Sequence, residues 1–103
     1  MADEKLTVVA RCKAKPGREE EVEREIVALV EPTRSESGCI NYDLHRSLDD
    51  GSVFLLYENW VSQQALDDHL ATPYLQRFLG KADEILAEPV EITRWKMITE
   101  LGR

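Results

Sequence analysis

Hydrophobic and polar residues alternate at the start of the chain, which is the pattern of a β-strand with one buried face. Between Lys5 and Ala14 the apolar positions are Leu6, Val8, Ala10 and Cys12. Lys15-Pro16-Gly17 ends this strand, because proline has no N–H for a neighbouring strand and glycine accepts backbone angles closed to other residues. The sequence therefore predicts a first strand from Lys5 to Ala14.

The next segment changes from the period of a strand to the period of a helix. Glutamates occupy positions 19 to 21, where the dipole at the start of a helix favours negative charge. The apolar residues then recur at i, i+4, i+7 and i+8, as Val22, Ile26, Leu29 and Val30. This pattern fades from Pro32 to Ser37, and we expect the helix to end there.

A turn signal separates two further strand-like segments. The first follows Gly38 and carries Ile40, Tyr42 and Leu44, and the second runs from Ser52 to Trp60. Asp49-Asp50-Gly51 lies between them, and Asp-Gly suits the positive dihedral angles of hairpin turns. The second segment is rich in β-branched and aromatic residues and is apolar on both faces. These features predict a hairpin whose second strand is central in the sheet.

Two helical segments and a last strand complete the pattern. Ser62 is placed to cap a short helix that carries Leu66 and His69, and Thr72-Pro73 starts the next helix. Pro89 ends that helix before a last strand from Val90 to Ile98. The order β-α-β-β-α-β is that of the ferredoxin-like α+β fold, an antiparallel sheet with helices on one face. We expect one such domain over residues 1–103.

The other face of this sheet needs a cover. Either register of the central strand leaves a large apolar row outside, made of Phe54, Leu56 and Trp60 or of Val53, Leu55 and Tyr57. We therefore expect a homodimer that packs sheet to sheet.

Composition and charge exclude several classes of protein. With 13 Lys and Arg against 20 Asp and Glu, the net charge of −7 would repel nucleic-acid phosphates, so no DNA or RNA partner is expected. The longest apolar stretches fall far short of the roughly 20 residues that span a bilayer. The polar start, Met1 to Lys5, lacks the features of a secretory signal, which predicts a cytoplasmic protein. Cys12 and Cys39 lack metal or redox spacing, and we expect two reduced, half-buried thiols and no metal site.

Residues suited to proton transfer and aromatic binding gather in one region, Tyr57-Glu58-Asn59-Trp60, with His69 and Tyr74 after it. His69 lies on an apolar helical face, so it is either an acid–base group or a histidine hydrogen-bonded in the core. Glu58, inside a strand, is expected to form an ion pair with Arg11 or Arg94. No GxGxxG, P-loop, HExxH or GxSxG motif occurs, and nothing supports a hydrolase.

These residues resemble the antibiotic biosynthesis monooxygenase (ABM) domain family over nearly the whole chain. The resemblance is carried by Lys15-Pro16-Gly17, by the segment from Ser37 to Tyr42, and most specifically by Tyr57-Glu58-Asn59-Trp60 with His69-Leu70-Ala71-Thr72-Pro73-Tyr74. It implies a dimeric α/β barrel with a pocket between the sheet and the helices.

The resemblance also implies an activity: oxidation of a small aromatic quinol or polyketide-like phenol by molecular oxygen without metal or flavin. His69 would be the base, Asn59 would donate to a developing oxyanion, and Tyr57, Trp60 and Tyr74 would contact the substrate. Whether Glu58 or Asn59 faces the pocket stays open, because neighbouring strand residues point to opposite faces.

Other activities within this family remain alternatives. Haem-degrading members need a first-strand Asn, a helical Trp where this chain has His69, and a ligand His near Leu79, so haem degradation is disfavoured. Relatives that isomerise a phosphorylated hydroxyketone would need a cation near the pocket, for which Arg94 is the candidate. A non-catalytic binding or stress-related domain is the third hypothesis.

Overall fold

The computed structural model describes residues 5–99, which form four strands and three helices. The elements are β1 (Leu6–Lys13), α1 (Glu19–Arg34), β2 (Cys39–Arg46), β3 (Val53–Trp60), α2 (Gln63–Leu70), α3 (Pro73–Ile85) and β4 (Glu91–Trp95). The polar segment 1–4, which supports the expectation of a cytoplasmic protein, lies outside the described residues.

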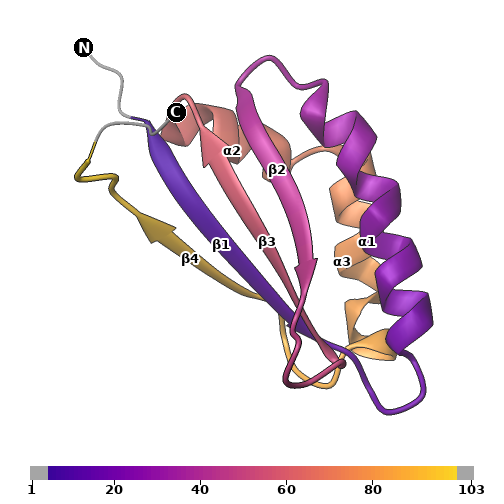
Figure 1. The fold of residues 1–103 in the computed structure, drawn as a ribbon. Coiled ribbons are helices and arrows are strands. Elements are labelled where there is room, and N and C mark those ends of the chain that lie inside the picture. Colours follow the sequence, from indigo (N-terminus) through magenta and orange to yellow (C-terminus); the bar gives the residue numbers. More distant parts are fainter. Residues whose placement is uncertain (1–4, 100–103) are drawn as a thin grey trace.

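The strands form one antiparallel sheet in the order β2-β3-β1-β4, and the helices lie on one face of it (Figure 1). This confirms the predicted ferredoxin-like α+β fold and the hairpin of β2 and β3. β3 pairs with both β2 and β1, so it is central as predicted.

The turns and helix starts follow from the residues that the sequence singled out. Gly17 has a positive φ of 86°, which explains a glycine between β1 and α1. The Ser62 hydroxyl accepts from the Ala65 N–H at 3.1 Å and caps α2. Thr72 caps α3, and Pro73 stands in its first turn.

One predicted boundary is confirmed and one is wrong. Helix α1 ends at Arg34, within the expected segment from Pro32 to Ser37, and the Ser35 N–H closes its last turn on Glu31 and Pro32. The last strand covers only Glu91–Trp95 of the predicted segment from Val90 to Ile98. Trp95 pairs with Thr7, next to the start of β1 at Leu6, so later residues have almost no strand beside them.

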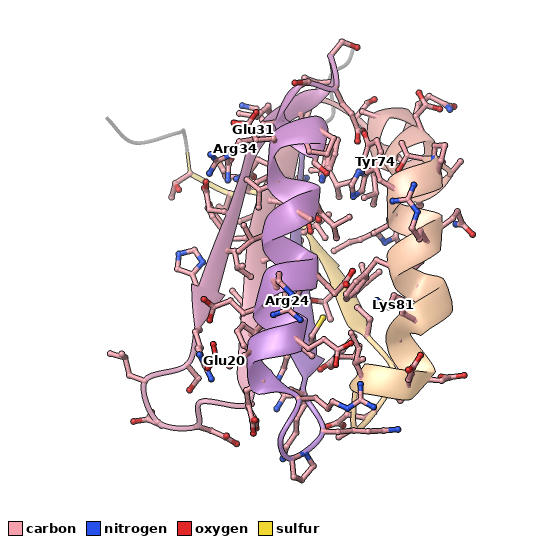
Figure 2. The ribbon with its side chains drawn as sticks, turned by 90° about the vertical axis from the view of Figure 1, so that its right-hand side faces the viewer. Glu20, Arg24, Glu31, Arg34, Tyr74 and Lys81 are labelled. Carbon is pink, nitrogen blue, oxygen red and sulfur yellow. The ribbon has the colours of Figure 1, made fainter. Side chains whose placement is uncertain are left out.

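The core lies between the sheet and the helices. Residues with even numbers on β1 and β3 face inward, and Val8, Cys12, Phe54 and Trp60 are each 2% exposed or less. Figure 2 shows α1 and α3 side by side over the sheet, and an ion pair of 2.9 Å joins Lys81 on α3 to Glu25 on α1.

The opposite face of the sheet carries the other row of β3, Val53, Leu55 and Tyr57. None of these three is buried, and Tyr57 is 40% exposed. Trp95 on β4 adds an indole that is 56% exposed to the same face. Of the two registers considered from the sequence, the structure thus has the one that turns Phe54, Leu56 and Trp60 inward.

Within residues 5–99 no helix is long and apolar enough to cross a membrane.

Candidate functional site

His69 lies in the last turn of α2, on the face that packs against the sheet. Its side chain is almost fully buried, at 2% exposure. The ring centroid lies 4.7 Å from that of Trp60, with a tilt of 34° between the planes, and the Tyr42 ring meets it edge-on at 5.5 Å. Two aromatic rings therefore fix the plane and position of the imidazole.

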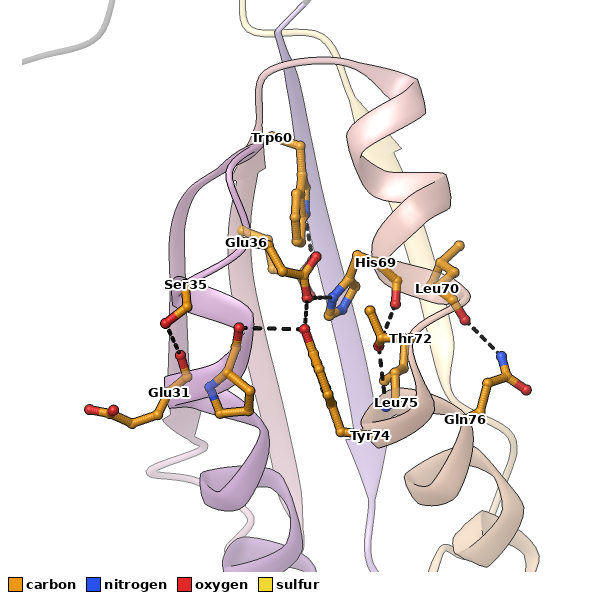
Figure 3. Close-up of polar contacts among 12 residues, drawn as sticks. Glu31, Ser35, Glu36, Trp60, His69, Leu70, Thr72, Tyr74, Leu75 and Gln76 are labelled. Atoms are coloured by element: carbon orange, nitrogen blue, oxygen red, sulfur yellow. Dashed lines mark hydrogen bonds and ion pairs between the residues drawn. The ribbon is translucent and has the colours of Figure 1, made fainter.

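A carboxylate from a distant segment binds one nitrogen of this imidazole. Nδ1 of His69 lies 2.9 Å from Oε2 of Glu36, in the loop between α1 and β2. The Tyr74 hydroxyl donates to the same oxygen (Figure 3). Because a carboxylate only accepts hydrogen bonds, neutral His69 carries its proton on Nδ1. Nε2 then holds a lone pair, and it has no hydrogen-bond partner among residues 5–99.

No local pattern selected Glu36, which lies 33 residues before His69. Its position directly before the segment from Ser37 to Tyr42, which resembles the ABM family, was the available signal. Helix α1 and the loop after it bring the carboxylate over α2.

His69 lines a small cavity between the sheet and α1, α2 and α3. Its volume is about 30 Å³, counted as the space that the centre of a water molecule can reach. Among the described residues, the lining contains one imidazole, His69, and one carboxyl group, Glu58, and no lysine or arginine. The other lining residues are Val8, Ala10, Cys12, Leu29, Tyr42, Leu56, Leu66, Leu70, Leu75, Phe78, Leu79, Val90 and Ile92. An apolar chamber with two proton-handling groups is typical of a site for a small apolar molecule.

Of the neighbouring residues Glu58 and Asn59, Glu58 faces this cavity, which answers the question that the sequence left open. Its side chain is 3% exposed, and Oε1 accepts from the Trp60 indole N–H at 2.9 Å. Burial, which outweighs the Trp60 hydrogen bond, raises the pKa of the carboxyl to about 7, and the nearby Glu36 adds to the rise.

The predicted ion pair of Glu58 with Arg11 or Arg94 is wrong. Arg11 lies 3.8 Å from Glu88 instead, and Arg94 donates to the Gln63 side chain at 2.8 Å. Arg11 occupies the open face of β1, and Arg94 extends toward the start of α2 near the solvent.

The structure brings some of the predicted site residues together and separates others. The Trp60 ring packs against the His69 ring. The Tyr74 hydroxyl donates to the same Glu36 oxygen that His69 contacts. Arg94 is absent from the cavity lining, and Tyr57 lies on the open face of the sheet. Asn59 also lies on that face, where its amide accepts from Thr7 at 2.6 Å and donates to Asn41 at 2.9 Å.

The two cysteines are free, as predicted, but only Cys39 is half-buried, because Cys12 faces the core and is 2% exposed. Burial raises the pKa of each thiol to about 11, so both stay protonated near neutral pH. Within residues 5–99, no three His, Cys, Asp or Glu side chains gather as a metal site would require.

A second hollow lies at the other end of the sheet, near Lys13, Glu19 and the Asp50-Gly51 turn. Arg46 in its lining lies 3.7 Å from Glu20, which also lines it, and 3.0 Å from Glu23 beside it. This hollow is open, and its described lining residues include no buried acid–base group.

Comparison with known proteins agrees with this architecture. An uncharacterised Synechocystis protein is 38% identical over 93% of this chain, which spans 65% of the length of that relative. A Mycobacterium tuberculosis protein, Rv0793, named as a candidate monooxygenase, is 34% identical over 85% of this chain and 86% of its own.

Solved structures give the same result. The crystal structure of PA3566 from Pseudomonas aeruginosa superposes with a TM-score of 0.89 at 36% identity, over 96% of this chain and 98% of that one. The structure of Rv0793 also reaches a TM-score of 0.89, over 95% and 99% of the two chains. The sequence profile described as antibiotic biosynthesis monooxygenase matches residues 5–81. This match covers all four segments that carry the resemblance, and the chain therefore belongs to the antibiotic biosynthesis monooxygenase family.

Proposed function

We propose that this protein is a cofactor-independent monooxygenase that oxidises a small aromatic quinol or polyketide-like phenol with molecular oxygen. The observation that carries the proposal is the state of His69. Its Nδ1 is held by Glu36, and its ring lines an otherwise apolar cavity with Nε2 free of protein partners in residues 5–99. An imidazole held in this way is suited to remove a phenolic proton.

The reaction needs no other reductant, because the substrate supplies the electrons. A 1,4-quinol and one O₂ give a hydroxyquinone and one water. The ring loses four electrons, one oxygen atom forms a new ring C–O bond, and the other leaves as water with two protons from the substrate. His69 would take the first proton, since the phenolate is the form that passes electrons to O₂. The apolar walls would exclude bulk water during this step.

Trp60 and Tyr74 support His69 in this proposal. Trp60 fixes the ring plane, and Tyr74 orients the carboxylate that holds Nδ1. The roles predicted for Asn59, Tyr57 and Arg94 would require a substrate that reaches the open face of the sheet or the β4 edge, because these side chains lie outside the cavity.

Substrate entry requires the cavity to widen. A volume of 30 Å³ holds about two water molecules, at roughly 10–15 Å³ each by this measure. The partly exposed lining residues mark its mouth: Leu70, Leu79, Val90 and Ile92. β4 pairs with β1 alone, so the wall at this mouth is held by one strand neighbour. We expect β4 and the segment before it to move when a ring enters.

The other functional expectations are proposals of the same kind. We propose that the protein is cytoplasmic and that a homodimer forms through the open face of the sheet. The isomerase alternative receives no support from the cavity, because no arginine or lysine in the described chain lines it to hold a phosphate. The small volume is the observation that favours a non-catalytic domain.

Oxygen uptake by purified, metal-free and flavin-free protein tests the proposal. The substrates are a panel of hydroquinones and anthrones, and the variants are His69→Ala and His45→Ala. His45 is an exposed histidine on β2 and serves as the matched control. We expect uptake above the spontaneous rate that falls by about 100-fold in His69→Ala and is unchanged in His45→Ala. A loss below about threefold in His69→Ala would remove the histidine from catalysis, and no uptake by the wild type would favour the other two functions.

A further inference from the structure

Glu58 is a buried carboxyl group with one oxygen that no protein group binds. Its Oε1 accepts the Trp60 indole N–H at 2.9 Å, and among residues 5–99 no group bonds to Oε2. The side chain is 3% exposed and lines the same cavity as His69. Trp60 lies against both groups, since its N–H binds Glu58 and its ring centroid is 4.7 Å from that of His69. A molecule in this cavity therefore contacts both groups.

The surroundings of Glu58 favour its neutral form. The titratable or charged groups that face it from the neighbouring elements are Cys12 on β1, Cys39 and Tyr42 on β2, Glu36 in the loop before β2, His69 on α2 and Arg94 on β4. Helices α1 and α3 contribute only apolar residues to the cavity lining.

No arginine or lysine of the described chain neutralises this carboxyl. Arg94 lies two strands away and donates to Gln63. A carboxyl group without such a partner keeps its proton, here up to a pH near its pKa of about 7. Because Oε1 accepts from Trp60, the proton belongs on Oε2, the oxygen that is free to meet a substrate.

Oxidation of a quinol needs a second proton transfer after the one assigned to His69. Once His69 has taken the phenolic proton, two electrons of the phenolate form a C–O bond between the neighbouring ring carbon and O₂, which gives a peroxide anion. If the O–O bond then breaks, the ring keeps one oxygen and the other leaves as water. If the new C–O bond breaks instead, hydrogen peroxide leaves and the ring becomes a plain quinone. A proton on the outer oxygen and a base for the ring hydrogen favour the first outcome.

We propose that Glu58 is a second catalytic residue, which gives its proton to the outer peroxide oxygen and then removes the hydrogen from the ring carbon that carries the peroxide. The electron pair of that C–H bond forms a C=O bond, while the pair of the O–O bond leaves with the outer oxygen. That oxygen takes its second proton from His69 and departs as water. The ring product, a hydroxy-1,2-quinone, is a tautomer of the hydroxyquinone. Glu58 and His69 both return to their starting states, as in other sites where one carboxyl group is first acid and then base.

The fate of the consumed oxygen tests this role, which rests on the proposed function for the substrate and its place in the cavity. The probes are hydroquinone and 1,4-naphthalenediol at pH 6 and pH 8.5. Oxygen uptake, hydrogen peroxide and the ring product are measured, and the reaction without protein is subtracted. Glu58→Gln can neither give nor take the proton, and Glu88→Gln is the matched control at a side chain that is 50% exposed.

We expect the wild type at pH 6 to form mainly the hydroxyquinone, with hydrogen peroxide as a minor product. In Glu58→Gln, the share of oxygen recovered as hydrogen peroxide should rise at least about fivefold, because the peroxide leaves before its O–O bond breaks. The wild type should show a rise of this kind at pH 8.5, where Glu58 has lost its proton, and Glu58→Gln should show the same share at both pH values. Glu88→Gln should match the wild type. A purely structural role of Glu58 would change the rate of uptake and leave this share as it is.

The role of Glu58 and the proposed oxidation can fail separately. A peroxide share in Glu58→Gln equal to that of the wild type at pH 6 would overturn the role and leave the oxidation standing. No oxygen uptake by the wild type would overturn the oxidation and the role with it. If Glu58→Gln does not fold, the wild type decides, because a peroxide share that stays constant between pH 6 and pH 8.5 would overturn the role.

Discussion

Two carboxyl groups lie in different surroundings at this site. Glu36 is partly exposed and accepts hydrogen bonds from His69 and Tyr74. Glu58 is buried with a single donor, Trp60, which favours its neutral form. A buried acid whose pKa is raised toward neutrality is a common feature of acid–base sites.

The raised pKa of Glu58 predicts a specific dependence of stability on pH. A carboxyl with a pKa near 4.5 when unfolded and about 7 when folded stabilises the fold fully below pH 4.5, and this contribution is lost as the pH rises through 7. Glu58→Gln removes the titration. We expect the variant to be more stable than the wild type at pH 9, by an amount on the order of 1–3 kcal/mol, and to lose this advantage at pH 4.5.

Urea unfolding at pH 4.5, 7 and 9 measures this difference. Glu88→Gln is the matched control, since the Glu88 side chain is 50% exposed and pairs loosely with Arg11. Its effect on the free energy of unfolding should stay small at each pH. A Glu58→Gln effect that is constant across this range would show that the carboxyl does not titrate near neutrality.

The Glu36 carboxylate should determine which nitrogen of His69 carries the proton. Replacing it by leucine removes the acceptor at Nδ1, so we expect neutral His69 in Glu36→Leu to move toward the tautomer protonated at Nε2. Nitrogen chemical shifts of the ring report this change without any substrate. Oxygen uptake should fall at least about tenfold, because Nε2 then carries the proton and has no lone pair to accept one from the substrate.

Tyr74→Phe is the control for this prediction, since it removes the other donor to the same Glu36 oxygen and leaves the carboxylate in place. The Nδ1–H tautomer should persist in Tyr74→Phe. If the ring shifts of Glu36→Leu match those of the wild type, the carboxylate does not set the tautomer.

At the scale of elements, the sequence predicted the number, type and order of the strands and helices. Alternation in β1, the helical period of α1 and the Asp-Gly turn are local signals, and each depends on residues close together in the chain. The one wrong boundary depends on a tertiary neighbour, because the end of β1 limits β4. The Glu36–His69 contact spans 33 residues and depends on how α1 packs, so no local pattern contained it.

The close approach of α2 to the start of β2 predicts a sensitive glycine. A methyl group added at Gly38 would overlap the Ala65 side chain and press on Val61, while the Gly38 carbonyl accepts the Val61 N–H at 3.0 Å. Gly38→Ala should therefore push α2 outward and cost about 1–3 kcal/mol of stability. Because Gly38 follows Glu36 by two residues, the His69–Glu36 hydrogen bond should loosen as well.

Gly80→Ala is the matched control, because a methyl group there meets nothing within 4 Å in the helix α3. We expect it to stabilise the protein by up to about 1 kcal/mol through the higher helix propensity of alanine. The midpoints of thermal unfolding of both variants measure these effects. If Gly38→Ala unfolds at the same midpoint as Gly80→Ala, then α2 accommodates the extra methyl group without strain.

The whole molecule has one covered and one uncovered sheet face. The helices bury the row of β3 that includes Trp60, whereas the apolar row of Val53, Leu55 and Tyr57 stays open beside the Trp95 indole. Exposed apolar side chains on a flat sheet favour association with a matching surface, and a second copy supplies one by symmetry. The two exposed edge strands, β2 and β4, would then lie at the rim.

A lysine in the middle of this open face should prevent the homodimer. In Leu55→Lys, the new ammonium group would lie beside Arg11, the strand partner of Leu55, and association would bury this added charge in the middle of the interface. We expect the wild type to elute at micromolar concentration with twice the mass of one chain and Leu55→Lys to elute as a monomer. Val27→Lys should remain dimeric, because Val27 is equally apolar and 53% exposed but lies on α1, on the other side of the molecule. Light scattering measures the mass directly. A monomeric wild type would reject the dimer, and dissociation of both variants would place the interface elsewhere.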